Sequence, residues 1–179
     1  MQAIPRKSVL WEYLSSEQQG LIEDGELLSE YAHKMPHGVS DYSYLVFPFS
    51  KAYEGFLKKL FLDMKLMRPE DYYGEDIRIG KILNPHFVKE YGSVYNRVCR
   101  DGVENGENKV AARLWETWKK GRNLVFHYFP HNFRRLSFEE AKEIIGEIIS
   151  SMTFAMEKCD LPVYVGRSKI ESVDSLVSA

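Results

Sequence analysis

Cysteine is scarce in this chain of 179 residues, which has only Cys99 and Cys159 and no Cys-x-x-Cys pair. A redox or metal site built on that motif is therefore excluded. Few and isolated thiols are typical of proteins that stay in a reducing compartment. We therefore expect isolated thiols and a cytoplasmic protein.

Long apolar runs are also missing. Residues 1–7 contain no long apolar segment, so a secretory signal is not expected. The richest apolar run, 44–49, is broken by Pro48 and is far too short to cross a bilayer, so we expect no membrane partner. The sequence has no glycine-rich phosphate loop and no Gly-x-Ser-x-Gly motif, which argues against the enzyme classes that use them.

The bulk composition is that of a globular protein with a sizeable core. Hydrophobic residues make up 44% of the chain and charged residues 28%. The length suits one domain with tails, and the sequence contains no internal repeat. We predict an N-terminal helical extension over residues 1–39, a helical domain over 40–160 and a flexible, polar tail over 161–179.

Helical patterns dominate the chain. Capping boxes at Ser15–Gln18 and Ser137–Glu140 predict two helix starts, the first leading into an interrupted helix that ends near residue 34. Helical periodicity also covers residues 51–67 and 108–120, with Pro48 marking a kink or the true start of the former. The apolar residues expected to face the core are Leu21, Leu28, Tyr31, Ala32, Tyr53, Phe56, Leu57, Leu60, Phe61, Met64, Met67, Val110, Leu114, Trp118, Ala141, Ile144, Ile145, Ile148, Ile149, Met152 and Met156.

The segments between these helices contain turn residues. We expect residues 68–85 to form a long connection, with a possible short strand at 76–79, and residues 101–106 to form a second loop. Pro85 is placed to open a helix that runs to about residue 97. Because no strand pair is convincing, the sequence predicts an all-α bundle of four to five helices.

A basic segment stands out in an acidic chain. Residues 117–138 carry five lysines or arginines, two histidines and no carboxylate. All 26 acidic residues lie in the rest of the chain, and the net charge of the whole chain is −2. A local excess of positive charge indicates an anion site. The alternative is a solvated helix end with a cationic last turn.

Arg122, Asn123 and His127 lie within this basic segment. A permanently charged guanidinium close to an imidazole that titrates near neutrality suits chemistry on a phosphate. On a straight α-helix, positions five apart diverge by about 140°, so Arg122 and His127 would not converge, whereas Asn123 and His127 would share a face. Convergence needs the length of Arg122, a kink near Gly121 or a second copy of the motif, and we therefore predict a homodimer with this stretch in its interface.

Two histidine pairs, His33/His37 and His127/His131, have a spacing that could hold zinc. A proline precedes the second histidine of each pair, and no cysteine or Glu-x-x-His partner lies nearby. We therefore predict no metal site and no cofactor.

Residues 122–127, Arg-Asn-Leu-Val-Phe-His, resemble the signature of the HEPN superfamily of ribonucleases, in which four to six residues separate an arginine from a histidine. Residues 50–60 are similar to a helix of the ribonuclease LS branch, whose basic residue and glutamate, three apart, match Lys51 and Glu54. The branch has arginine at the first of these positions, so Lys51 is a departure that loses bidentate phosphate contact. The resemblance covers about residues 40–160 and lacks the N-terminal domains of the longer toxins.

The resemblance implies a metal-independent endoribonuclease, in a toxin or defence role, in which a ribose 2′-hydroxyl attacks the adjacent phosphate. His127 would transfer a proton, Arg122 would stabilise the transition state, and Asn123 would orient His127 or the phosphate. Glu54 would act as a base or hold Arg122, and Lys51 would hold the RNA backbone. Further RNA contacts are expected from the remaining basic side chains near the motif, namely Lys119, Lys120, His131, Arg134 and Arg135.

Three alternatives stay open. The triplet Lys51, Glu54 and Lys58 could be an exposed set of helical ion pairs. The chain could be a HEPN-like binding or scaffold module without catalysis. It could also be a toxin whose partner, a nucleotidyltransferase antitoxin, modifies a tyrosine after the motif, although Tyr128 lies one place earlier than that tail requires.

Overall fold

The computed structural model describes residues 2–35, 38–86, 94–99, 103–104, 107–127, 130, 135–159 and 161. Within these residues the fold is all-α, as predicted, apart from one very short hairpin. The elements are α1 (Val9–Tyr13), α2 (Ser16–Lys34), α3 (Ser43–Asp63), α4 (Pro69–Tyr73), α5 (Ile79–Ile82), β1 (Val103–Glu104), β2 (Glu107–Asn108), α6 (Lys109–Trp118), the π-helical turn η2 (Lys119–Leu124) and α7 (Phe138–Lys158).

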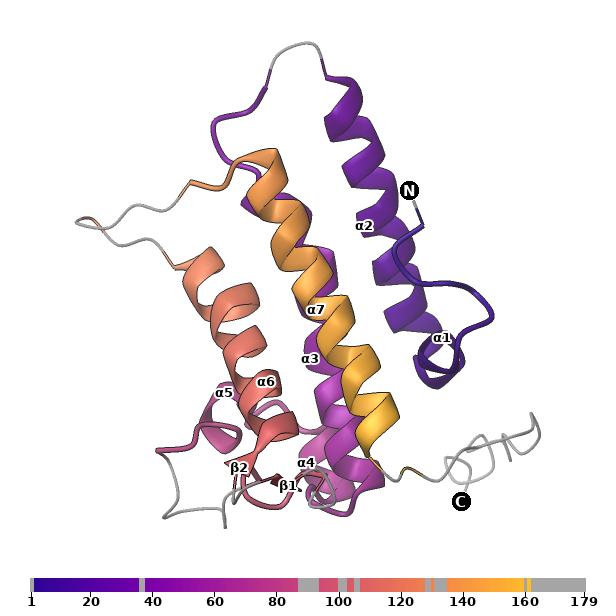
Figure 1. Ribbon diagram of the computed structural model, residues 1–179, viewed down its shortest axis with the longest axis vertical. Coiled ribbons are helices and arrows are strands. Elements are labelled where there is room, and N and C mark those ends of the chain that lie inside the picture. The colour runs from indigo at the N-terminus through magenta and orange to yellow at the C-terminus, as the bar shows by residue number, and fades with distance from the viewer. Residues whose placement is uncertain are drawn as a thin grey trace, which may run out of the picture.

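Four long helices form the body of the molecule. In Figure 1, α2 and α6 run in one direction, and α3 and α7 run in the other. Helix α3 packs against both α2 and α7, and α7 also packs against α6. The short elements α4, α5, β1 and β2 gather at one end of the bundle (Figure 1). No helix in the described part of the chain is long and apolar enough to cross a membrane.

Helix α2 begins where the capping box predicted. The Ser15 hydroxyl accepts from the Gln18 backbone N–H, and the Gln18 side chain accepts from the Ser15 N–H. The helix runs through Gly20 and Gly25 without a break. Gly25 packs directly against the Phe49 ring of α3. The predicted apolar face is wrong in part. Helix α2 buries the face that includes Ala32, whereas Leu28 and Tyr31 are 40% and 57% exposed on another side.

Helix α3 supplies the centre of the core. Tyr53, Phe56, Leu57, Leu60 and Phe61 are all buried, as their spacing predicted. The hydroxyl of Tyr53 donates to the Leu114 carbonyl of α6 at 2.9 Å, so the buried polar group has a partner. The helix begins at Ser43, so Pro48 lies inside it and does not mark its start.

Asp41 joins the starts of α3 and α7. Its carboxylate accepts from the Ser43 N–H at 2.9 Å, the Ser43 hydroxyl at 2.6 Å and the Leu136 N–H at 3.1 Å. The Tyr42 N–H donates in turn to the Leu136 carbonyl at 2.9 Å. Partial burial acts to raise the pKa of Asp41, but these hydrogen bonds and the nearby Arg135 charge outweigh it and lower the pKa.

The connection between α3 and α6 contains more structure than predicted. Short helices α4 and α5 lie within residues 68–85, and the possible strand at 76–79 is not formed. Part of the predicted loop at 101–106 forms strand β1, which pairs with β2 in a hairpin of two-residue strands. Residues 84–86 and 94–99 are not helical, and the rest of the helix expected after Pro85 lies outside the described residues.

Helix α7 confirms its predicted start and core face. Ser137 and Glu140 form the second capping box. Ala141, Ile148 and Met152 are fully buried, whereas Ile144, Ile149 and Met156 lie at the edge of the core. The N-terminal residues share this core, because Ile4, Leu10, Leu14 and Ile22 belong to the same hydrophobic cluster. The tail from residue 162 lies outside the described part of the chain.

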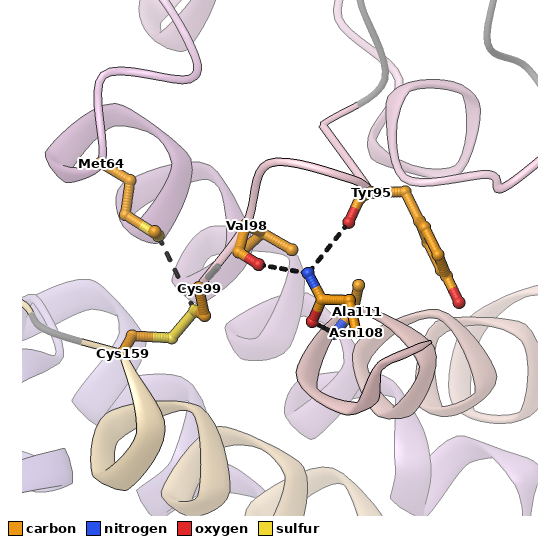
Figure 2. The surroundings of a disulfide bond; sticks show 7 residues. All are labelled: Met64, Tyr95, Val98, Cys99, Asn108, Ala111 and Cys159. Atoms are coloured by element: carbon orange, nitrogen blue, oxygen red, sulfur yellow. Dashed lines mark hydrogen bonds between the residues drawn. A yellow bond between two sulfur atoms is a disulfide. The ribbon is translucent and has the colours of Figure 1, made fainter. Parts of the chain in front are cut away.

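Cys99 and Cys159 form a disulfide, so the prediction of isolated thiols is wrong (Figure 2). The bond joins residues 60 apart, with a Cα–Cα distance of 4.8 Å, and both residues are buried. Beside it, the Asn108 side chain donates to the Val98 carbonyl at 2.6 Å and caps α6 (Figure 2). Disulfides persist mainly in oxidising compartments, so the cysteines no longer support a cytoplasmic location.

Candidate active site around Arg122 and Glu54

Arg122 and Glu54 are 68 residues apart in sequence and form an ion pair in the structure. The Arg122 Nε lies 3.6 Å from the Glu54 Oε2, and the side chains are 42% and 31% exposed. This distance allows charge attraction but exceeds the range of a good hydrogen bond. The guanidinium has five N–H donors and is not enclosed, so it stays accessible to an anion from solvent.

A π-helical turn positions Arg122. Helix α6 passes directly into η2, so the helix predicted over residues 108–120 continues past Gly121 as a wider helical turn. Gly121 is buried, and a Cβ placed there would lie 3.0 Å from the Ile148 Cδ1 of α7. Its carbonyl accepts a hydrogen bond from the buried hydroxyl of Ser50. These two contacts hold the residue before Arg122 against α7 and α3, and single π turns occur often at functional sites.

The other motif residues are also exposed at the surface. Lys51 lies on α3, one turn from Glu54, and is exposed. Asn123 is exposed on η2, and His127 is exposed just after the helical residues 125–126. Because η2 is not α-helical, the predicted shared face of Asn123 and His127 does not follow from α-helix geometry.

The π turn also bears on the predicted homodimer. The homodimer was predicted from a straight α-helix, in which Arg122 and His127 point in different directions. A π turn bonds residues five apart and gives the segment a different angular step. The homodimer therefore stays a prediction, but poor convergence along an α-helix no longer motivates it.

The basic residues near the motif do not form one free positive surface. Lys119 pairs with Glu116 at 2.8 Å, and Lys120 pairs with Glu147 of α7 at 3.0 Å. Lys120 therefore faces α7, whereas Arg122 faces α3. The sequence could not show this, because the partner carboxylates of Lys120 and Arg122 come from other helices.

The remaining predicted RNA contacts are divided between described and undescribed residues. Arg135 is exposed just before α7 and lies near Asp41. His131 and Arg134 lie outside the described residues. The second histidine of each predicted pair, His37 and His131, is also undescribed, so neither pair is tested. Among the described residues, no group of three or more His, Cys, Asp or Glu side chains could hold a metal ion.

Two aromatic side chains that the sequence did not single out border the site. Phe47 of α3 and Phe126 form a T-shaped pair with ring centroids 5.7 Å apart. The Arg122 guanidinium lies 5.5 Å from the centre of the Phe126 ring, within cation–π range. Ser50 is a third residue that was missed. The signal for it was a small polar side chain within the apolar run of α3, and the signal for Phe47 was its i,i+4 spacing to Lys51.

The ion pair lies at the surface, because both side chains are partly exposed. Two grooves, of about 660 and 600 Å³, lie away from it, the first near Met67 and Arg97 and the second between α2 and α7. A partly exposed arginine held by a carboxylate can bind and polarise a phosphate that approaches from solvent.

No protein-family model, curated protein or solved structure matches this chain. The fold and the contacts around Arg122 therefore carry the functional argument.

Proposed function

We propose that this chain is a metal-independent RNA endonuclease with a HEPN-like helical bundle, acting as a toxin or defence effector. The observation that carries the proposal is the contact between Arg122 and Glu54. The resemblance paired two short motifs from distant parts of the chain, and nothing in either motif required them to meet. Their side chains lie 3.6 Å apart, which supports a shared site.

The proposed reaction is attack of a ribose 2′-hydroxyl on the adjacent phosphate, which forms a 2′,3′-cyclic phosphate and breaks the bond to the 5′-oxygen of the next nucleotide. The 2′-hydroxyl loses a proton, and the departing 5′-oxygen gains one and leaves as a hydroxyl. His127 transfers a proton, and its exposed position leaves it accessible to RNA. Arg122 stabilises the negative charge of the transition state. Glu54 holds Arg122 in place through the ion pair between the two side chains. Lys51 contacts the RNA backbone, and Asn123 orients the phosphate.

The test is cleavage of a labelled RNA by the wild type and by single variants. Arg122→Ala and His127→Ala should each reduce turnover by about 10²–10³-fold, as expected for loss of a transition-state contact. Glu54→Gln should reduce turnover less, because the amide can still contact Arg122. Lys142→Ala is the matched control and should keep wild-type turnover, since it removes a cation of α7 that is paired with Glu139 and has no part in the proposed reaction. The products should carry 2′,3′-cyclic phosphate ends.

A folded His127→Ala protein that cleaves RNA at the wild-type rate would refute the catalytic assignment. A wild type that binds RNA or a protein partner without cleaving RNA would favour the binding module.

The nucleotidyltransferase antitoxin is tested separately. Co-expression with such an enzyme should modify Tyr128, and this residue lies outside the described part of the chain.

A further inference from the structure

The Phe47 side chain is exposed to an unusual degree for a phenylalanine. It lies on α3, and 51% of its surface is accessible to solvent. A T-shaped contact joins the edge of one ring to the face of the other, so each ring of the Phe47–Phe126 pair keeps at least one face outside the contact. The Arg122 guanidinium lies over the Phe126 ring, which is only partly exposed, so Phe47 is the ring of the pair with more surface open to a ligand.

Each ring of this pair lies one helical turn from a cation. Lys51 follows Phe47 by four residues on α3, and Phe126 follows Arg122 by four residues. One α-helical turn is about 5.4 Å along the axis, well within the reach of a lysine side chain. Lys51 is exposed and has no ion-pair partner among the described residues. An aromatic face beside a free cation matches a nucleobase beside its phosphate.

We propose that Phe47 is a stacking platform for a nucleobase of single-stranded RNA, with Lys51 contacting the phosphate backbone beside it. This inference rests on the proposed function, because it names the form of RNA that the site accepts. Only an unpaired, unstacked base has a face available to an aromatic side chain, so duplex RNA should gain nothing from Phe47. A protein partner or a second copy could also cover the ring, but a free lysine beside it favours a polyanion.

The test uses a fluorescein-labelled oligomer of 2′-O-methyl adenosine, ten nucleotides long, and the full chain. The blocked 2′-hydroxyl prevents cleavage, so affinity is measured apart from catalysis. Phe47→Ala should weaken binding about tenfold, as expected for loss of one stacked base. Phe47→Leu keeps apolar packing against Phe126 but lacks an aromatic face, and it should weaken binding equally. Phe47→Trp should bind at least as tightly as the wild type.

Tyr73→Ala is the matched control, because this tyrosine is 82% exposed on α4, at the end of the bundle where the short elements gather (Figure 1). It should leave affinity unchanged. Salt dependence separates stacking from charge: Lys51→Met should reduce the slope of log affinity against log salt by about 1, whereas Phe47→Ala should leave the slope unchanged. An oligomer with 2-aminopurine should lose fluorescence on binding to the wild type but less so with Phe47→Leu.

Unchanged affinity in both Phe47→Ala and Phe47→Leu would overturn the inference. A Phe47→Ala protein that differs from the wild type in oligomeric state on sedimentation, yet binds the RNA oligomer with unchanged affinity, would also overturn it. Phe47 would then be a contact between protein chains. The proposed function fails in a different way, by absence of cleavage of natural RNA. A wild type that binds the oligomer through Phe47 but cleaves nothing would refute the nuclease and leave the platform standing.

Discussion

Removal of the Ser50 hydroxyl should loosen the π turn that carries Arg122. Ser50 is only 2% exposed, and its hydroxyl donates to the carbonyl of Gly121, 71 residues later in the chain. The substitution Ser50→Ala removes one buried hydrogen bond and adds no bulk. A typical buried hydrogen bond contributes about 1 kcal/mol, and a carbonyl left without its partner adds to the loss. We therefore expect the free energy of unfolding to fall by about 1–2 kcal/mol.

The same substitution should affect activity more than stability. Gly121 immediately precedes Arg122, so a shift of the turn moves the guanidinium relative to the bound phosphate. A displacement of about 1 Å in a catalytic group can reduce the rate about 10²-fold. We expect kcat for RNA cleavage to fall by about 10-fold to 100-fold. KM should change little, since the surface contacts to RNA are intact.

Ser151→Ala provides a matched control on α7. Ser151 is fully buried, but the Tyr53 hydroxyl lies 3.4 Å away, at the limit of hydrogen-bond distance. This variant should lose less stability than Ser50→Ala and keep wild-type turnover. Urea denaturation gives the unfolding free energy, and single-turnover cleavage gives the rate. If the two variants behave alike in both assays, Ser50 does not position the Arg122 turn.

Three further results are expected. A chelator should leave RNA cleavage unchanged, because the proposed reaction uses side-chain acid–base chemistry; activity that is lost in EDTA and restored by a divalent ion would refute this. Reduction of the disulfide, or the double variant Cys99→Ser/Cys159→Ser, should lower the unfolding free energy by up to about 4 kcal/mol in urea denaturation, given the 60-residue separation. Asp41→Asn should destabilise the protein by about 1–2 kcal/mol at pH 7, because its hydrogen bonds favour the ionised form. Since the pKa of Asp41 is lowered in the folded state, this stabilisation is complete above about pH 4 and disappears as the pH falls through the folded pKa. A wild type–Asn difference that does not shrink as the pH falls below about 4 would contradict that role.

Local features of the sequence were enough to predict the main helices. The capping boxes at Ser15 and Ser137 fix helix starts through contacts within one turn, so no tertiary information was needed. The core face of α3 was predicted equally well, because a long apolar stripe has only one way to be buried. The apolar face of α2 was not, since its sequence offers two competing stripes and packing against Phe49 selects the one with Gly25.

Features that depend on contacts between distant segments were not predictable in the same way. The π turn at Gly121 is tied to Ser50 and Ile148, which lie on two other helices. The disulfide likewise needs the end of α7 to meet the loop that holds Cys99. A pattern of local spacing contains no information on which distant segment will be adjacent.

The ion pair between Arg122 and Glu54 is better explained by positioning than by stability. Both side chains are partly exposed, and pairs of this kind contribute only about 0–1 kcal/mol to folding. Neither side chain fills the core, so the fold does not require either of them. What the pair does is restrict a long, flexible arginine to one side of η2, next to α3. An arginine that is already oriented loses less conformational entropy when it binds a phosphate, so in the proposed reaction Glu54 would assist catalysis without contact to the substrate.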